Sequence, residues 1–391
     1  MLSRVDVDEN AYPGFFSPGF LLDVPRAINH HATSLITPHS SWKLGVKCVT
    51  IPRSGISHVG IIMLSNAIMI IVAAFIVAFL ITFLAAPPFI AFLRRKKMGQ
   101  QIREDGPQRH LSKAGTPTMG GVVILVGVVL GTVACWFFHP RGWRLSALLL
   151  ALTLAVAAIG SIDDWGKIRH GRSLGLRARE KLLLQFLVAG LFVLGLVVWL
   201  HHGTSIGLPG GHLLALGWVY WPLAILFIAG MSNAVNLTDG LDGLAAGVTV
   251  AAALALAAIA CWAGALSVAA FIATLAAACL AFLCFNRHPA SVFMGDTGSL
   301  AIGAALAGTA LALKQEVLLL LIGLIFLIEM FSVIIQVISF KTTGKRVFRM
   351  SPFHHHLELG GWSEPKIVTR AWLLGTLLAL LACGTSCYLS R

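Results

Sequence analysis

Long uninterrupted runs of apolar residues recur along this 391-residue chain, and they decide its fold class. A run of roughly 18 such residues or more is long enough to cross the hydrocarbon core of a bilayer as a helix. Charged residues make up only 12% of the chain and the mean hydropathy is +0.85, which is too apolar for a soluble protein. The runs also lack the residue-by-residue alternation of an outer-membrane barrel. Since backbone groups in lipid must be satisfied internally, the chain is predicted to be an all-α polytopic membrane protein.

About ten transmembrane helices are expected, each of ~20 residues. They are placed near residues 64–92, 117–138, 145–162, 182–200, 214–236, 243–261, 265–285, 298–313, 317–340 and 371–389. Pro87 and Pro88 are expected to kink the first of them. Residues 63–391 are therefore predicted to form one ten-helix domain.

The segment before the first span has a different character. Residues 1–62 are mixed in composition, contain several histidines and show neither a span nor a signal-peptide pattern. Met63 stands at the start of the first span. Residues 1–62 are therefore interpreted as the product of a start codon assigned too early, with a disordered extracytoplasmic extension as the alternative.

Orientation in the membrane follows from the lysines and arginines between the spans. The loops after odd-numbered spans carry 20 of them, whereas those after even-numbered spans carry Arg141, Arg144 and Lys314. Because basic residues accumulate on the cytoplasmic side, the odd loops are predicted to be cytoplasmic and both termini extracytoplasmic. The net charge of +13 is then concentrated on one face, where it would meet anionic lipid and phosphate. The sequence shows no nucleic-acid-binding module, so the positive charge is not expected to bind nucleic acid.

Five of the 16 acidic residues fall in three short motifs, GSIDDWGK (160–167), NLTDGLDG (236–243) and FMGDTGSL (293–300). Each motif lies at a predicted cytoplasmic span end. Interfacial acids and Gly-Asp turns are common, but acids placed repeatedly on one face of so apolar a chain favour a shared site. Carboxylate oxygens suit Mg²⁺, which shares its coordination with substrate phosphates, and glycine-rich turns offer N–H groups to anions. Lysines such as Lys113 and Lys167 would offset phosphate charge.

Five stretches resemble a known enzyme family: KAGTPTMGG, DDWGK, NLTDGLDGL, FNRHPASVFMGDTGSL and SPFHHHLELGGW. In this order they are similar to the phospho-N-acetylmuramoyl-pentapeptide transferases (MraY), a group of polyprenyl-phosphate N-acetylhexosamine-1-phosphate transferases. The resemblance covers roughly residues 63–391. It implies transfer of phospho-MurNAc-pentapeptide from UDP-MurNAc-pentapeptide to undecaprenyl phosphate, giving lipid I and UMP, with Mg²⁺. It also implies a ten-helix homodimer in the bacterial inner membrane, with its active site facing the cytoplasm.

The same resemblance implies roles for individual residues. Asp163, Asp164 and Asp296 match the essential acids, which are expected to be catalytic and to hold the metal. His354, the first residue of the histidine triplet, is also expected to be catalytic. The expected substrate-binding residues, with Asp239 near the uracil, are Lys113, Thr118, Lys167, Asn233, Asp239, Asp242, Asn286, Ser299, Gln336, His355 and His356.

Two mechanisms stay open at this point. In one, Asp163 removes a proton from undecaprenyl phosphate before direct attack on the β-phosphate; in the other, an aspartate is a covalent nucleophile in two steps. A phosphate monoester has its second pKa near ~6 and is mostly dianionic at neutral pH, so a base would contribute modestly. Direct attack, with Mg²⁺ bridging the diphosphate, is therefore favoured.

Two other functions share some of these sequence features. A WecA-like transferase of N-acetylglucosamine-1-phosphate shares the acid motifs, but the last cytoplasmic loop favours the first function. A secondary transporter would place its ionisable residues near the membrane midplane, whereas here they lie at one face.

The cysteines and the histidine triplet lack the spacing of zinc ligands, so phosphate or sugar contacts are expected of the histidines. Glu329, inside the ninth span, is either functional or a helix-to-helix hydrogen-bonding partner. Leu174 stands where many relatives carry a basic residue, which leaves that loop's phosphate contacts open.

Overall fold

The computed structural model describes residues 58–96, 99, 115–139, 141–170, 175–208 and 211–389. All of them belong to one compact unit, Val46–Arg391. The expectations for residues 1–57, and those for Lys113 and Leu174, lie outside the described residues.

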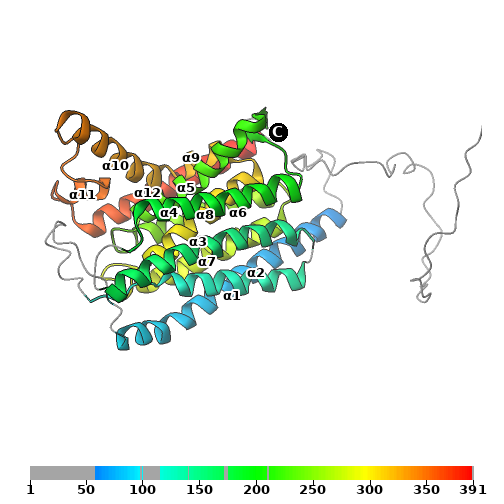
Figure 1. The fold of residues 1–391 in the computed structure, drawn as a ribbon. Coiled ribbons are helices and arrows are strands. Elements are labelled where there is room, and N and C mark those ends of the chain that lie inside the picture. Colours follow the sequence, from blue (N-terminus) through cyan, green and yellow to red (C-terminus); the bar gives the residue numbers. More distant parts are fainter. Residues whose placement is uncertain are drawn as a thin grey trace, which may run out of the picture. The chain divides into compact units, whose positions relative to one another are not determined.

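Helices dominate the described chain (Figure 1). They are α1 (His58–Arg95), α2 (Gly121–Phe138), α3 (Trp143–His170), α4 (Ala178–Leu194), α5 (Tyr220–Thr238), α6 (Leu244–Trp262), α7 (Leu266–Asn286), α8 (Gly295–Leu313), α9 (Glu316–Ile322), α10 (Leu324–Thr343), α11 (Phe353–Glu358) and α12 (Glu364–Leu389). A π-helical turn (Gly195–Trp199) extends α4, and a 3-10 turn (Gly217–Val219) precedes α5. Within the described ranges, ten helical segments are long and apolar enough to cross a membrane. The predicted all-α polytopic fold and the number of spans are confirmed.

Helix α1 is longer than the first predicted span. It begins at His58, so the expected boundary at Met63 lies inside the helix. It also continues through Pro87 and Pro88 as one helix, although each proline removes a backbone donor.

The ninth predicted span is two helices in the structure. Helix α9 ends at Ile322, Gly323 follows, and α10 begins at Leu324. Figure 1 shows α10 diverging from the other long helices toward the short helix α11. This break was not predicted, because the residues on both sides of Gly323 are equally apolar.

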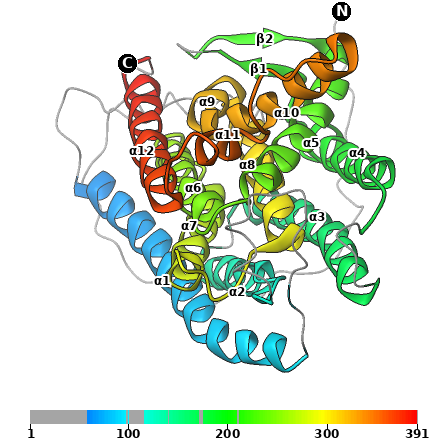
Figure 2. The same ribbon diagram turned by 90° about the vertical axis from the view of Figure 1, so that its left-hand side faces the viewer.

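The centre of the bundle is packed through small residues. In the end-on view of Figure 2, α8 lies near the centre, with α3, α5 and α7 around it. Every residue from Thr297 to Leu313 is buried. A Cβ added at Gly303 of α8 would overlap the carbonyl oxygen of Met231 on α5. Close backbone approach of this kind is how helices associate in lipid, where dispersion replaces the hydrophobic effect as the driving force.

The two ends of α8 hold different polar groups. Its first turn contains Asp296, and Lys314 follows its last residue, about 27 Å away at the usual helical rise. The Lys314 ammonium donates to the carbonyl oxygens of Gly203, at 3.0 Å, and Ser205, at 2.6 Å. These residues lead into a small antiparallel hairpin, β1 (Ser205–Gly207) and β2 (Leu213–Ala215), in the connection from α4 to α5. The hairpin was not predicted from the sequence, which indicated only a connection between two spans there.

Candidate active site

Asp163, Asp164 and Asp296 meet where α3 ends and α8 begins. The first two lie in the last two turns of α3, and Asp296 lies in the first turn of α8. One carboxylate oxygen from each lies within 4.8 Å of the others. The side chains of Asp163 and Asp164 are only 4% and 3% exposed, so these charges are held largely out of water.

Asp164 joins α3 to the start of α8. Its Oδ1 accepts the backbone N–H of Asp296 at 3.1 Å. Its Oδ2 accepts the backbone N–H of Thr297 at 2.9 Å and the Thr297 hydroxyl at 2.7 Å. The first N–H groups of a helix lack partners within it, and a negative charge there complements the helix dipole. Asp164 therefore fixes the position of Asp296 relative to α3.

The turn before Asp296 requires glycine. Gly295 has a φ of 74°, in the left-handed region. A Cβ at this position would lie 2.6 Å from Oδ2 of Asp164 and 3.0 Å from the hydroxyl of Thr118. Thr118, an expected substrate-binding residue, is thus placed beside the acids.

Two lysines offset the charge of the acids. The Lys167 ammonium lies 2.6 Å from Oδ2 of Asp163 and 3.0 Å from Oδ2 of Asp296. Lys181, in the first turns of α4, lies 2.6 Å from the same Asp296 oxygen, and its side chain is 14% exposed. Charge-assisted hydrogen bonds of this kind are roughly twice as strong as neutral ones. The site therefore holds three acids and two ammonium groups in direct contact.

Asn236 supports Asp296 from α5. Its Nδ2 donates to Oδ1 of Asp296 at 2.8 Å and to Ser299 Oγ at 2.8 Å. The expected residue Ser299 therefore lies beside the acids. Asn233, one turn earlier on α5, instead donates to Oε1 of Gln185 on α4 at 2.7 Å, so it links two helices.

Asp239 directly follows α5 and is partly buried. The backbone N–H of Gly295 donates to its carboxylate. Burial, together with the nearby carboxylates of Asp296 and Asp164, raises the pKa of Asp239 well above its ordinary range. Asp239 therefore keeps a proton more readily than an ordinary aspartate.

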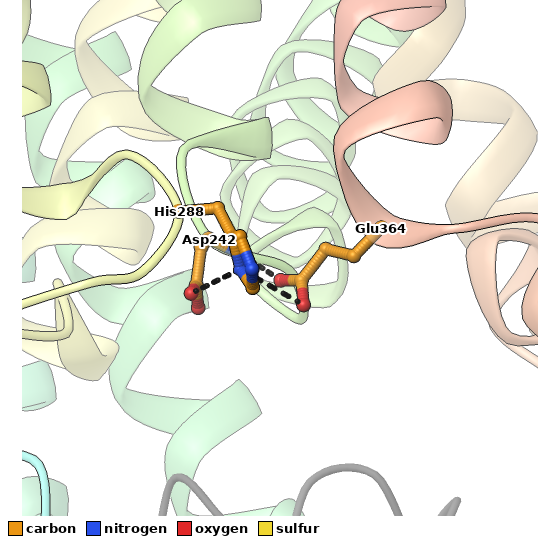
Figure 3. Close-up of side chains that lie close together, drawn as sticks. All are labelled: Asp242, His288 and Glu364. Carbon is orange, nitrogen blue, oxygen red and sulfur yellow. Dashed lines mark hydrogen bonds and ion pairs between the residues drawn. The ribbon is translucent and has the colours of Figure 1, made fainter.

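Asp242 belongs to a second cluster, with His288 and Glu364 (Figure 3). The three side chains come from the turn before α6, the loop after α7 and the first residue of α12. Nδ1 of His288 lies 3.2 Å from Oδ2 of Asp242 and 3.5 Å from Oε2 of Glu364. Oε1 of Glu364 also accepts the Asp242 backbone N–H at 2.6 Å. The imidazole therefore joins three segments around Asp242.

The histidine triplet lies on α11 in three different environments. His354 is 1% exposed, and its Nδ1 lies 3.1 Å from Oε2 of Glu329. Nδ1 of His355 lies 2.7 Å from Oε2 of Glu358. Nδ1 of His356 accepts the backbone N–H of Arg349 at 3.1 Å. Each of the three imidazoles therefore bonds to a different part of the protein.

Two more of the expected residues hold loops in place. The Gln336 side chain accepts the backbone N–H of Phe348 at 2.9 Å and donates to its carbonyl oxygen at 3.0 Å. Oδ1 of Asn286 accepts the Gly243 N–H at 3.1 Å, and its Nδ2 donates to the Val292 carbonyl oxygen at 3.0 Å. Each of these side chains therefore holds neighbouring loop residues against its own helix.

Comparison with known proteins identifies the family. Residues 146–314 match the model of Glycosyl transferase family 4, and residues 113–125 match phospho-N-acetylmuramoyl-pentapeptide-transferase signature 1. The phospho-N-acetylmuramoyl-pentapeptide-transferase of Halalkalibacterium halodurans is 50% identical over 315 residues, which cover 80% of this chain and 96% of the relative. Those of Bacillus velezensis and Desulforudis audaxviator are 49% identical over 317 residues (80% and 96%) and 48% identical over 316 residues (78% and 95%). The chain belongs to the phospho-N-acetylmuramoyl-pentapeptide-transferase family.

In this family member, several of the site residues predicted from the sequence lie together in the structure. Asp163, Asp164 and Asp296 meet, with Lys167 among them. Sequence reasoning missed Lys181, at the end of RSLGLRAREK, and Asn236, inside the NLTDGLDG motif. Both are polar residues near a span end, which could have marked them as site residues. That pattern does not predict which acid each of them contacts.

The donor set of the transferase-family site fits a hard divalent cation. Carboxylate oxygens from Asp163, Asp164 and Asp296 converge without sulfur or imidazole among them, which is the ligand type that Mg²⁺ prefers. Lys167 contacts Asp163 and Asp296, and Lys181 contacts Asp296, so these lysines would share the acids with a bound ion.

Proposed function

We propose that this protein transfers phospho-MurNAc-pentapeptide from UDP-MurNAc-pentapeptide to undecaprenyl phosphate, forming lipid I and UMP. The observation that carries the proposal is the identity of about half of the aligned residues with proteins named phospho-N-acetylmuramoyl-pentapeptide-transferase, over nearly their whole length. The cluster of three acids and two lysines supports the proposal, because phosphoryl transfer needs charge compensation and positioning more than covalent chemistry. The names of these relatives do not favour a WecA-like transferase.

The chain's own groups suit direct attack by the acceptor phosphate. Lys167 and Lys181 would offset the negative charge that accumulates on the transferred phosphoryl group. Both oxygens of Asp164 already accept hydrogen bonds from the start of α8, which makes this carboxylate a poor covalent nucleophile. Mg²⁺ held by Asp163, Asp164 and Asp296 would supply further charge compensation for the diphosphate.

The location of the site is also part of the proposal. Lysines and arginines concentrate in the loops at the ends of α1, α3 and α10, and basic residues favour the cytoplasmic side. We therefore infer that the three acids face the cytoplasm of a bacterial inner membrane, where a UDP-linked substrate is available. The predicted homodimer remains a prediction.

The test is an assay of the purified full chain in detergent. UMP release and the lipid-linked product are measured with undecaprenyl phosphate and either UDP-MurNAc-pentapeptide or UDP-GlcNAc. We expect turnover with the first nucleotide, its loss in chelator, and its recovery on adding Mg²⁺ or Mn²⁺. Preference for UDP-GlcNAc would contradict the substrate, and full activity in chelator would contradict the metal requirement.

A further inference from the structure

A group of buried polar side chains lies against the hairpin, at the end of α8 opposite the acids. Besides its two carbonyl partners, the Lys314 ammonium lies 4.7 Å from the centroid of the Tyr220 ring. Oε2 of Glu316, at the start of α9, accepts the backbone N–H of Gly207 on β1 at 3.0 Å. Tyr220 is 0% and Glu316 is 6% exposed. The start of α5, the start of α9 and β1 therefore meet at a polar site that is closed to bulk water.

His202 joins this group from the segment before β1. Its Nε2 lies 2.8 Å from the Ala312 carbonyl oxygen, which can only accept, so Nε2 carries the ring hydrogen. Burial and the Lys314 ammonium lower the pKa of His202 to about 4, so its ring is neutral at neutral pH. Nδ1 of the neutral ring then has a lone pair and no hydrogen.

Three atoms of this group are buried and have no hydrogen-bond partner among the described residues: the Tyr220 hydroxyl, Oε1 of Glu316 and Nδ1 of His202. Only the hydroxyl has a hydrogen to donate, so it cannot satisfy both of the other two atoms. A buried polar atom without a partner costs free energy, and native proteins nearly always supply the partner. Water can donate to the carboxylate and to the imidazole while it accepts the hydrogen of the phenol.

We propose that the Tyr220 hydroxyl, Oε1 of Glu316 and Nδ1 of His202 bind internal water between α5, α9 and the hairpin. A buried water molecule typically makes about three hydrogen bonds to polar groups that otherwise lack partners. A metal cation would also suit the two acceptors, but the Lys314 ammonium already supplies positive charge beside the Glu316 carboxylate. The water therefore fastens the hairpin to the helix bundle, independently of the transferase chemistry at the other end of α8.

Hydroxyl-radical labelling of the purified full chain tests for the water directly. Radiolysis of a bound water molecule produces a radical beside the side chains that hold it, so a buried tyrosine is oxidised where water contacts it. We expect Tyr220 to be oxidised and Phe271, which is equally buried in α7, to stay unmodified. Exchange of the Gly207 amide hydrogen reports opening of the hairpin in the same preparations. A Tyr220 as unreactive as Phe271, or oxidised only as fast as the Gly207 amide opens, would overturn the proposal.

Two hydroxyl deletions separate a hydrated group from one without water. Thr309, inside α8, is a second buried hydroxyl without a partner among the described residues. Thr309→Val is the matched control and should leave Tm unchanged or raise it, because an unpaired hydroxyl contributes no stability. Tyr220→Phe should lower Tm by ~2 °C or more, since the water loses one of its partners. A Tm of Tyr220→Phe at or above that of the wild type would contradict hydration of this hydroxyl.

A double-mutant cycle tests whether two of the groups share the water. His202→Gln keeps a donor for the Ala312 carbonyl oxygen and removes the Nδ1 lone pair. Its loss in Tm and that of Tyr220→Phe should be less than additive, because the second deletion affects a water that the first has already loosened. Strictly additive losses would overturn the shared site.

Salt dependence distinguishes water from a metal cation at the same atoms. Tm of the wild type is measured in choline chloride and with added Na⁺, K⁺ or Mg²⁺, and we expect the same Tm at equal ionic strength. A Tm that rises saturably with one metal ion, and rises less in His202→Gln, would identify a cation site and overturn the assignment of water.

Discussion

Asp163 and Asp164 are adjacent in sequence and identical in type, yet they contact different partners. Asp163 accepts the backbone N–H of Leu176 at 2.8 Å and binds Lys167, so it faces the loop before α4. Asp164 receives three hydrogen bonds from the start of α8. One acid therefore contributes mainly charge to the site, while the other also holds two helices together.

Asp163→Asn and Asp164→Asn should consequently differ in stability. Each is expected to lower turnover by at least ~100-fold, because a charge near the transferred phosphoryl group is lost. Only Asp164→Asn should also lower Tm by several degrees, since its amide can oppose the α8 N–H groups at a cost on the order of 1–3 kcal/mol. Activity and thermal unfolding are measured on the same preparations. Equal Tm values for the two variants would contradict the linking role of Asp164.

Lys181 offers a second test at this scale. Its ammonium contacts Asp296 directly, so Lys181→Met should lower turnover by ~10-fold to ~100-fold, and Lys181→Arg should retain more activity. Arg179→Met, an exposed neighbour on α4, is the matched control and should remain near wild type. The assay is UMP release at saturating substrate. A fully active Lys181→Met would exclude the lysine from the site.

The sequence predicted the acids and Lys167 but not the other partners of the acids, for a physical reason. Acids are easily recognised in an apolar chain, and the predicted span ends show to within a few residues that these acids lie at the membrane face. Whether a lysine such as Lys181 meets Asp296, or Asn233 turns toward Gln185 rather than the acids, depends on helix rotation, which short polar segments do not encode. The position of His354 was likewise hidden, since its partner Glu329 lies 25 residues earlier on another helix.

At the scale of elements, the lengths of the apolar runs predicted nearly every helix, but helix breaks and short elements depend on single residues. The break at Gly323 and the short helix α11 escaped prediction, because neither interrupts an apolar run nor creates a new one. The hairpin also escaped, since its strands have only three residues each. The apolar runs do contain many glycines and alanines, and such small residues are typical of closely packed helices in membranes.

Gly303 provides the test of that packing. Gly303→Ala places a methyl group against the Met231 carbonyl of α5 and should destabilise the protein by about 1–3 kcal/mol, the usual cost of overpacking. Gly230→Ala, on α5 beside Met231, meets open space and should be neutral or slightly stabilising. Thermal unfolding in one detergent compares the two variants. Equal effects would mean that helix propensity, rather than the α5–α8 contact, decides the outcome.

The hairpin end of the bundle contains a histidine whose charge is disfavoured. Nε2 of His202 lies 2.8 Å from the Ala312 carbonyl oxygen, and burial, with Lys314 nearby, lowers the pKa of His202 from 6.5 to about 4. Between these two pH values the unfolded chain binds a proton that the folded chain does not. Stability should therefore fall as pH drops through this window, and this loss is complete below the lower value.

His202→Asn should flatten that part of the pH dependence. Glu316 acts in the opposite direction, because burial raises its pKa, so the comparison must isolate His202. His201→Asn is the control, since His201 is the exposed neighbour. The measurement is Tm between pH 7 and pH 4 (roughly the window of the His202 shift). An unchanged slope in His202→Asn would contradict the linkage.

At the scale of the whole molecule, the acids and the hairpin occupy opposite ends of α8, so the proposed orientation can be tested from both sides. In a chain whose seven cysteines are replaced, Lys345→Cys and Leu213→Cys each introduce one exposed thiol. A membrane-impermeant maleimide should label Lys345→Cys in inside-out vesicles and Leu213→Cys in right-side-out vesicles. The reverse pattern would place the acids outside the cell.

The complete burial of α8 also bears on the order in which the chain is made. Of the ten candidate spans α8 is the least apolar, and no residue from Thr297 onward in this helix faces the surroundings. A span of this kind gains little from lipid, so its insertion depends on contacts with helices already synthesised, above all α3 and α5. Asp164 and Asn236 are therefore present in the membrane before the ribosome reaches their partner Asp296. A nascent chain halted before residue 295 would hold two of the three acids without a working centre, which makes catalytic competence a late event in biosynthesis.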